Sequence, residues 1–336
     1  MKTEREIMQA GDTFDEFTII QHVGSGGFGD IYKVKKSTDE DFICALKIEN
    51  KKAGYKKQAL LHEVELFRKI NSPYIPKFIK FGENPKYRYF FLELCGPSIS
   101  SLRKKLPDHK YSLSTVLRLS IEMVRCIESF HSFGLLHRDI KPGNFLIRPS
   151  LSYPLALIDF GLSRPYINSR TNEPIPPRIK PGFVGTERYG SPYAHQGIEL
   201  GRRDDMFSWF YSVMEMYNGS LPWTELDGQE VVKAKEHAKV LEAIVGMPKQ
   251  MTEIYRLIRR MRRQDKPNYE LIISFLVDAM NECGVKWDEP FDWETKLQEN
   301  ELNEISSISL KPPENEVPNI PKDLPPPVLP PVQSKK

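Results

Sequence analysis

The stretch LLHRDIKPGNFLI, residues 135–147, decides the fold, together with LALIDFGLSR at residues 155–164. Apolar residues flank polar side chains in both stretches. The polar side chains are Asp139, Lys141 and Asn144 in the first and Asp159 in the second. A salt-bridged loop without chemistry is one interpretation of such a pattern, and a catalytic loop is the other. Motifs earlier in the chain distinguish between them.

The glycine-rich segment GSGGFG, residues 24–29, is the first of these motifs. Glycines let a backbone approach phosphates closely and offer its N–H groups to them. The same spacing also occurs in dinucleotide-binding folds and in flexible turns. A dinucleotide fingerprint opens a helix, whereas here DIYKVK, residues 30–35, continues as a strand. The segment is therefore predicted to be the turn of a β-hairpin that covers phosphates.

The segment CALKIE places Lys47 on a predicted strand, and Glu63 follows on a predicted helix. A buried ammonium needs a carboxylate partner and anionic phosphates, so Lys47 and Glu63 are predicted to pair and to grip the phosphates of a nucleotide. Glu65 competes with Glu63 for this role. An isolated surface lysine is the other interpretation of Lys47.

These motifs, in this order, resemble the catalytic signature of protein kinases. The resemblance implies an α+β, bilobal fold with a small mostly-β N-lobe and a larger mainly-α C-lobe. It further implies that ATP and Mg²⁺ are the cofactors. Asp139 would orient the substrate hydroxyl, Lys141 would contact the γ-phosphate, and Asn144 and Asp159 would hold Mg²⁺. Lys141 two residues after Asp139 is typical of the serine/threonine branch.

The resemblance also implies an adenine site, with Glu93 and Leu94 as the hinge between the lobes. The full set of expected ATP-binding residues is Val23, Gly24, Ser25, Gly26, Gly27, Phe28, Gly29, Ile31, Ala45, Lys47, Glu93, Leu94 and Leu146. Phe67 and Phe160 are expected to stack between the lobes. Asp205 is expected to brace the backbone of the HRD stretch, although an N-cap aspartate is an alternative.

The organisation of the chain follows from its changing periodicity. Strand-like segments FTIIQHV, DIYKVKK, FICALKIE and YRYFFLEL are interrupted by a helical stripe at Leu61, Val64, Phe67 and Ile70. After Gly96 the pattern is helical, with helices expected near 113–134, 204–218, 228–244, 251–263 and 268–283. We therefore divide the chain into an N-terminal extension (1–13), a kinase domain (14–294; N-lobe 14–94, C-lobe 97–294) and a Pro-rich, disordered tail (295–336).

Finer matches resemble the casein kinase 1 superfamily, and within it the tau-tubulin kinase branch. The matching stretches are ELCGPSISSLR, GTERYGSPYAHQGIELGRRDDMFSWFY, GSLPW, KPNYELIISFLVDAM and PFDWE. Most kinases close the activation segment with Ala-Pro-Glu, but this chain has Ser191, Pro192 and Tyr193 there. The usual Glu–Arg ion pair is therefore absent, and another contact must hold the segment.

Arg188 coincides with a position that helps to bind an anion in this superfamily. With Lys233 or Lys235 it is predicted to favour acidic or phosphoprimed substrate sites. The alternative is a solvated arginine beside a carboxylate such as Glu187.

Composition restricts the remaining classes. The net charge is +3, which singles out neither DNA nor membrane, and the N-terminus is too charged for a signal peptide. The four cysteines show no CxxC pairing and there is no membrane-spanning apolar run, so a monomeric cytoplasmic or nuclear protein is expected.

Two further segments suggest partners besides Ser/Thr protein substrates. YRLIRRMRRQDK, residues 255–266, puts five arginines on a predicted helix, which suits acidic or microtubule-associated proteins, although a solvated face is the alternative. PPPVLPP, residues 325–331, suits an SH3-type groove. The main rival to an active enzyme is a pseudokinase scaffold, and the complete set of catalytic residues argues against it.

Overall fold

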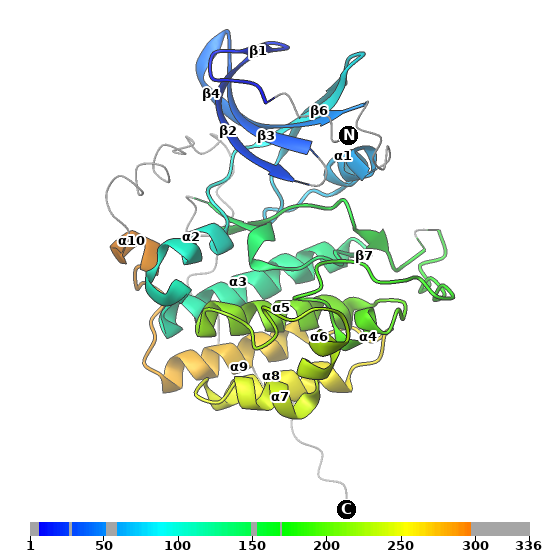
Figure 1. Cartoon of the computed structure of the whole chain (residues 1–336), viewed down its shortest axis with the longest axis vertical. Coiled ribbons are helices and arrows are strands. Elements are labelled where there is room, and N and C mark those ends of the chain that lie inside the picture. The colour runs from blue at the N-terminus through cyan, green and yellow to red at the C-terminus, as the bar shows by residue number, and fades with distance from the viewer. Residues whose placement is uncertain (1–6, 27–28, 52–58, 149–152, 169, 297–336) are drawn as a thin grey trace, which may run out of the picture.

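The computed structural model describes residues 7–26, 29–51, 59–148, 153–168 and 170–296. A curled β-sheet forms the N-terminal part, and helices form most of the C-terminal part, as the sequence predicts (Figure 1). Gly27, Phe28 and the tail from residue 297 lie outside the described residues.

The N-terminal sheet has six antiparallel strands in the order β1-β2-β3-β4-β6-β5. Four of them match the strand-like segments of the sequence. The short β1 and the strand β5 were not predicted, because β5 (FIKFGE) is half-buried along most of its length and shows no alternation. The strands are β1 (Thr13–Phe14), β2 (Phe17–Gly26), β3 (Gly29–Lys36), β4 (Asp39–Asn50), β5 (Phe78–Glu83) and β6 (Tyr87–Glu93).

The two faces of the sheet have different surroundings, and successive side chains of β4 point alternately to one face and to the other. Cys44, Leu46 and Ile48 are buried in an apolar cluster on one face. Ala45 and Lys47 alternate with them and face the other way. Helix α1 (Ala59–Lys69) packs on that other side, where the Phe67 and Phe90 rings lie 5.7 Å apart.

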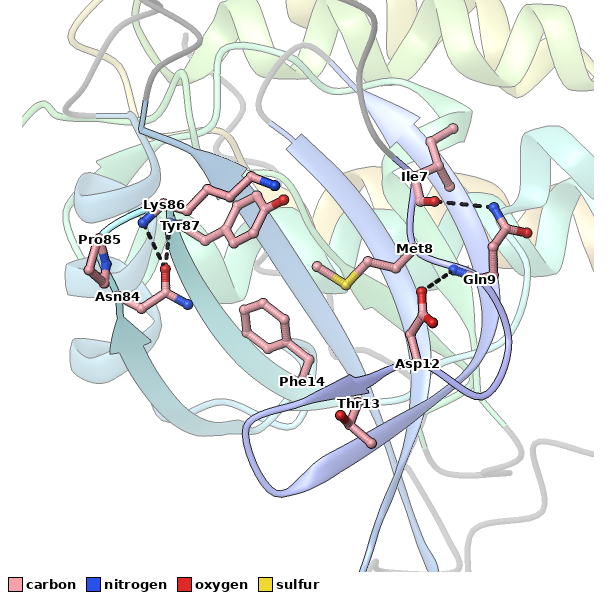
Figure 2. A pocket seen from close by; sticks show the side chains of 10 residues that line it. All are labelled: Ile7, Met8, Gln9, Asp12, Thr13, Phe14, Asn84, Pro85, Lys86 and Tyr87. Atoms are coloured by element: carbon pink, nitrogen blue, oxygen red, sulfur yellow. Dashed lines mark hydrogen bonds between the residues drawn. The ribbon is translucent and has the colours of Figure 1, made fainter.

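A pocket lies on the first of these faces, away from Lys47. Figure 2 shows Met8 from the N-terminal extension, Phe14 from β1 and Tyr87 from β6 directed into it. Polar groups surround this apolar floor, and Asn84 closes the rim by accepting hydrogen bonds from the Lys86 and Tyr87 amides. Residues 7–13 of the extension therefore lie against the outer side of the sheet.

The C-terminal part is built around α3, which packs against α5 and α9. Most of α5 is buried, and Trp209 and Phe210 at its centre are fully inaccessible. The helices are α2 (Ile99–Lys105), α3 (Leu113–Ser132), α4 (Pro192–His195), α5 (Arg202–Asn218), α6 (Gly228–Ala234), α7 (His237–Ala243), α8 (Lys249–Arg260), α9 (Tyr269–Glu282) and α10 (Asp292–Lys296).

Short elements carry the motif residues. β7 (Leu135–Leu136) precedes the HRD residues and pairs with β10 (Arg164–Pro165). A 3-10 turn at Pro142–Asn144 leads into β8 (Phe145–Ile147), which pairs with β9 (Leu155–Leu157). The two motif stretches thus form hairpin-like pairs side by side.

Two helix predictions were wrong. The single helix expected at 228–244 is split into α6 and α7, because the chain turns at Lys235 and buries that side chain. The arginine-rich helix ends at Arg260, so Arg262 and Arg263 lie beyond it. In the part of the chain that the structure describes, no helix combines the length and apolar character needed to cross a membrane.

Candidate active site

Asp205 holds the backbone of the HRD residues. Its carboxylate accepts hydrogen bonds from the His137 and Arg138 amides, both at 2.8 Å, and it lies 2.9 Å from Nε2 of His131. Burial disfavours the charge, but the His131 hydrogen bond and the two histidines outweigh it and lower the pKa of Asp205. The N-cap of α5 is Gly201, so the capping interpretation of Asp205 was wrong.

Asp139 sits in a hydrogen-bonded triangle. Its Oδ2 accepts from Lys141 Nζ at 2.6 Å, and its Oδ1 accepts from Thr186 Oγ1 at 2.7 Å. Lys141 and Thr186 also meet each other at 3.1 Å. From below, the Asn144 amide donates to the Asp139 carbonyl at 2.9 Å. Two side chains therefore fix the orientation of the carboxylate, and a third holds the backbone of the same residue.

Asp159 has the properties of a metal ligand. Its φ of 69° is unusual for a non-glycine residue, and its Oδ1 is buried without a hydrogen-bond partner among the described residues. Such an orphaned carboxylate oxygen fits a hard cation, and the amide oxygen of Asn144 would add a second oxygen donor. The neighbouring Phe160 ring packs between Phe67 and Phe130, at 4.8 and 4.9 Å, as the expected stack between the lobes.

The lysine of the sheet and the glutamate of α1 form the predicted ion pair. Lys47 Nζ lies 2.6 Å from Glu63 Oε2, and Glu63 is 2% exposed. Glu65, the competing partner, is exposed to solvent. Burial acts to lower the pKa of Lys47, but the carboxylates of Glu63 and Asp159 outweigh it and raise that pKa. The ammonium therefore stays charged.

The described residues expected around ATP lie on β2, β3, β4, β6 and β8, except Leu94, which directly follows β6. Ile31 is the cross-strand partner of Lys47 and of Gly24. Gly29 has a φ of +134°, and a Cβ there would lie 2.1 Å from the Ile48 carbonyl oxygen, so no other residue fits. Gly27 and Phe28 fall outside the described residues, as noted above.

The remaining expected positions lie farther along the same surface. Val23 is exposed on β2, Ala45 pairs with Leu92 across β4 and β6, and Leu146 on β8 forms a bridge with Ser98. Glu93, which ends β6, is held by Arg148 at 2.9 Å, and Leu94 follows it buried. Ser25 donates to Asp30 at 2.6 Å across the hairpin. The expected ATP positions on β3 and β4 are thus strand neighbours of Lys47, and the binding of ATP by the whole set stays a prediction.

The activation segment returns to the catalytic loop at Gly185. This residue has a φ of +108°, and a Cβ on it would lie 2.5 Å from the Arg138 carbonyl oxygen. Only glycine permits this approach, which brings the hydroxyl of Thr186 to Asp139. Thr186 was not among the site residues predicted from the sequence, and the Gly-Thr pair is the signal for its structural position.

The predicted anion site is only partly assembled. Arg188 is about two-fifths exposed and makes long contacts of 3.4 Å with Glu215 and with the Thr224 carbonyl. Lys233 is exposed and has no ion-pair or hydrogen-bond partner among the described residues. Both side chains remain available to an anion.

Including Lys235 in that site was wrong. Lys235 is 3% exposed, and its ammonium donates to the Glu187 and Gly190 carbonyls and meets His195 Nε2 at 3.0 Å. All three hydrogen-bond donors of the ammonium thus have partners within residues 187–195, so none is left for a substrate anion. Burial lowers the pKa of Lys235 to about 7.

Sequence reasoning missed Glu215, which joins three parts of the site. This carboxylate is 1% exposed, accepts from Tyr189 Oη at 2.7 Å and lies 3.4 Å from Arg103 and from Arg188. The signal was a charged residue inside the apolar helix sequence SVMEM. His131 was missed as well, and nothing in its local sequence indicates its contact with Asp205.

Comparison with known proteins gives a family match over most of the chain. A family profile described as "Protein kinase domain" matches residues 17–282. A probable serine/threonine-protein kinase of Dictyostelium discoideum is 36% identical over 83% of this chain, which spans 57% of that protein.

Two further relatives are similar over nearly their whole lengths. The serine/threonine-protein kinase spe-6 of Caenorhabditis elegans is 31% identical over 88% of this chain and 82% of its own. A probable casein kinase I homolog of Encephalitozoon cuniculi is 31% identical over 86% of this chain and 97% of its own.

Proposed function

Since this chain belongs to the protein kinase family and is a serine/threonine protein kinase, we propose that it transfers the γ-phosphate of Mg·ATP to Ser or Thr of acidic or phosphoprimed protein sites. The observation that carries the chemistry is the Asp139 carboxylate, oriented by Lys141 and Thr186. An oriented acceptor at this place receives the proton of an incoming hydroxyl. The hydroxyl oxygen then forms the new bond to phosphorus as the bond to ADP breaks.

The N-terminal side of the site binds the nucleotide. Lys47, kept charged by Glu63, is positioned for the phosphates, and the β2–β3 hairpin supplies backbone N–H groups. Asn144 and Asp159 would hold Mg²⁺, which neutralises charge on the transferring phosphoryl group when bound. Lys141 places a second cation beside Asp139, where negative charge develops during transfer.

Phosphoryl transfer from γ-labelled Mg·ATP tests this proposal. The substrates are casein and matched acidic, phosphoprimed and neutral peptides, followed by identification of the labelled amino acid. We expect label on Ser or Thr, and its loss in Asp139→Asn and in Lys47→Met. A folded protein that binds Mg·ATP without transferring phosphate would instead support the pseudokinase scaffold.

The preference for acidic sites depends on Arg188 and Lys233. Arg188 is held only by 3.4 Å contacts, so a phosphate or carboxylate on the substrate competes well for its guanidinium. Arg188→Ala should reduce kcat/KM for a phosphoprimed peptide about tenfold more than for a neutral peptide. Lys249→Ala, which removes an exposed cation at the start of α8 that pairs with Glu282, is the matched control. Equal losses with both peptides would contradict the assignment.

The more specific identity is a proposal as well. The stretches from GTERYGSPY onward support a place in the casein kinase 1 superfamily near the tau-tubulin kinase branch. Exposed Arg256, Arg259 and Arg260 on α8, far from the sheet in Figure 1, support an acidic or microtubule-associated partner. Salt-sensitive binding to microtubules that survives neutralisation of these arginines would exclude that surface.

The remaining proposals concern the tail and the cell. The PPPVLPP segment supports an SH3-type partner, which a pull-down with and without residues 297–336 tests. We also propose that the protein is a monomer and that it resides in the cytoplasm or the nucleus. Size-exclusion chromatography with light scattering and imaging of the tagged chain test these two expectations.

A further inference from the structure

A buried hydrogen bond closes the activation segment at its C-terminal end. Ser191 Oγ donates to Asp204 Oδ1 at 2.5 Å, and the two residues are 1% and 3% exposed. Oδ2 of Asp204 accepts from the Gly201 amide at 2.7 Å. Ser191 in turn accepts from the Ala194 amide at 3.0 Å and begins α4. The segment is thus tied to the start of α5 by a charge-assisted contact.

The position of this contact relates it to catalysis. Asp204 precedes Asp205, whose carboxylate holds the backbone of the catalytic loop. Ser191 follows Thr186 by five residues, and Thr186 donates to the catalytic Asp139. The first turn of α5 therefore contacts both sides of the site. Asp205 binds the backbone of the catalytic loop, and Asp204 binds the activation segment at Ser191.

We propose that Asp204 and Ser191 are positioning residues that set the activation segment against the catalytic loop. Their contact replaces the one that the glutamate of the Ala-Pro-Glu sequence makes in most kinases, because this chain lacks that glutamate. Neither side chain touches the reacting atoms. Their effect reaches the reaction through the distance between Thr186 and Asp139.

The energetics of Asp204 agree with a functional role. Burial raises the pKa of Asp204 to about 6, against the hydrogen bonds from Ser191 and Gly201 that lower it. Burying a carboxylate of this kind costs free energy of folding, and a protein with an apolar residue of the same shape in its place is often equally stable or more stable. A role in stability alone would not favour a carboxylate at this place.

Steady-state kinetics on the full chain test the proposal, with an acidic peptide and Mg·ATP at a temperature well below the measured Tm of every variant. Ser191→Ala should lower peptide kcat/KM about ten- to a hundredfold, while KM for ATP changes less than about twofold. Ser191→Thr, which keeps the hydroxyl, should restore most of the loss.

The matched control is Ser112→Ala. Ser112 is the N-cap of α3 and accepts from the Thr115 amide at 3.3 Å, away from the activation segment. Its removal costs a cap of the same kind, about 1 kcal/mol, and should leave kcat and both KM values unchanged.

A second set of variants tests the pair. Asp204→Leu removes the acceptor at constant shape and should reproduce the kinetic loss of Ser191→Ala. The double variant should be no worse than either single variant, because both remove the same contact. Asp204→Asn retains an acceptor and a donor, so it should keep more than about a third of the wild-type kcat/KM.

Three outcomes would overturn the proposal. One is a lowered Tm in Ser191→Ala with unchanged peptide kinetics, which would make the contact structural only. Another is an equal change in KM for ATP and for peptide. The third is additivity of the two losses in the double variant.

Discussion

The two halves of the active site are held in different ways. On the N-terminal side, one ion pair joins a strand to a helix: Lys47 to Glu63, at 2.6 Å. On the C-terminal side, Asp205 alone receives three hydrogen bonds, and Asp139 is fixed by several neighbours. The first half can therefore be switched by moving one helix, whereas the second is preorganised.

This difference indicates where substitutions act. Loss of the ion pair should disable the N-terminal half and leave the packing of α5 intact. Loss of a buried acceptor in the C-terminal half should disturb several backbone groups at once, since buried donors without partners are costly. Substitutions in the two halves should therefore differ in how they divide their effect between stability and activity.

The largest effect is expected for Asp205→Ala. The His137 and Arg138 amides would lose their acceptor inside the core, and His131 would lose its partner. We expect a loss of about 4 kcal/mol in the free energy of unfolding and a fall in kcat of about a hundredfold or more. Urea titration and phosphoryl transfer measure the two. Asp265→Ala, which removes an exposed acceptor of the Arg262 amide, should leave kcat unchanged and affect stability far less.

Lys47→Met should come next. It leaves the buried Glu63 carboxylate without its cation and should cost about 3 kcal/mol of stability as well as activity. The double variant Lys47→Met/Glu63→Leu should regain at least half of that stability and none of the activity. If the double variant is as unstable as the single one, the ion pair is not what costs stability, and the contrast between the halves weakens.

A pH-dependent effect is expected at Lys235. Its pKa is lowered to about 7 by burial, whereas the unfolded chain keeps the ordinary value of 10.5. Between pH 7 and pH 9 the unfolded state therefore binds more protons, so this residue makes stability rise with pH, by up to about 2 kcal/mol. Lys235→Met should remove that rise. The measurement is the difference in unfolding free energy between wild type and variant at both pH values, and equal pH dependence would contradict it.

The smallest effect is expected for an exposed pair on α8. Arg256 lies 2.8 Å from Glu253, and both side chains are about half exposed. Glu253→Gln should change stability by less than about 0.5 kcal/mol and leave kinetics unchanged. This variant is the reference for the three larger effects. A loss above about 1 kcal/mol in its free energy of unfolding would contradict the expectation that the cost of a substitution follows the burial of the residue.

Sequence motifs predicted the fold and the positions of Lys47, Glu63, Asp139, Asn144 and Asp159, because each lies in a local pattern with defined chemistry. Contacts between distant segments were not predictable in this way. Ser191 and Asp204 meet through the fold, and neither carries a local signal for the other. The helix break at Lys235 depends on carbonyl groups about 45 residues away in the sequence. The local sequence keeps its helical periodicity across the break, so periodicity alone predicted one continuous helix.

The geometry at Asp139 also limits how many partners the carboxylate accepts. Each carboxylate oxygen has two lone pairs, and one on each oxygen is taken, by Thr186 on Oδ1 and by Lys141 on Oδ2. Among the contacts of the described residues, the second lone pair of each oxygen is left for a substrate donor. The hydroxyl of Thr186 that donates to Asp139 is the same functional group that a serine/threonine kinase phosphorylates on its substrates, so the enzyme carries an internal copy of the group on which it acts.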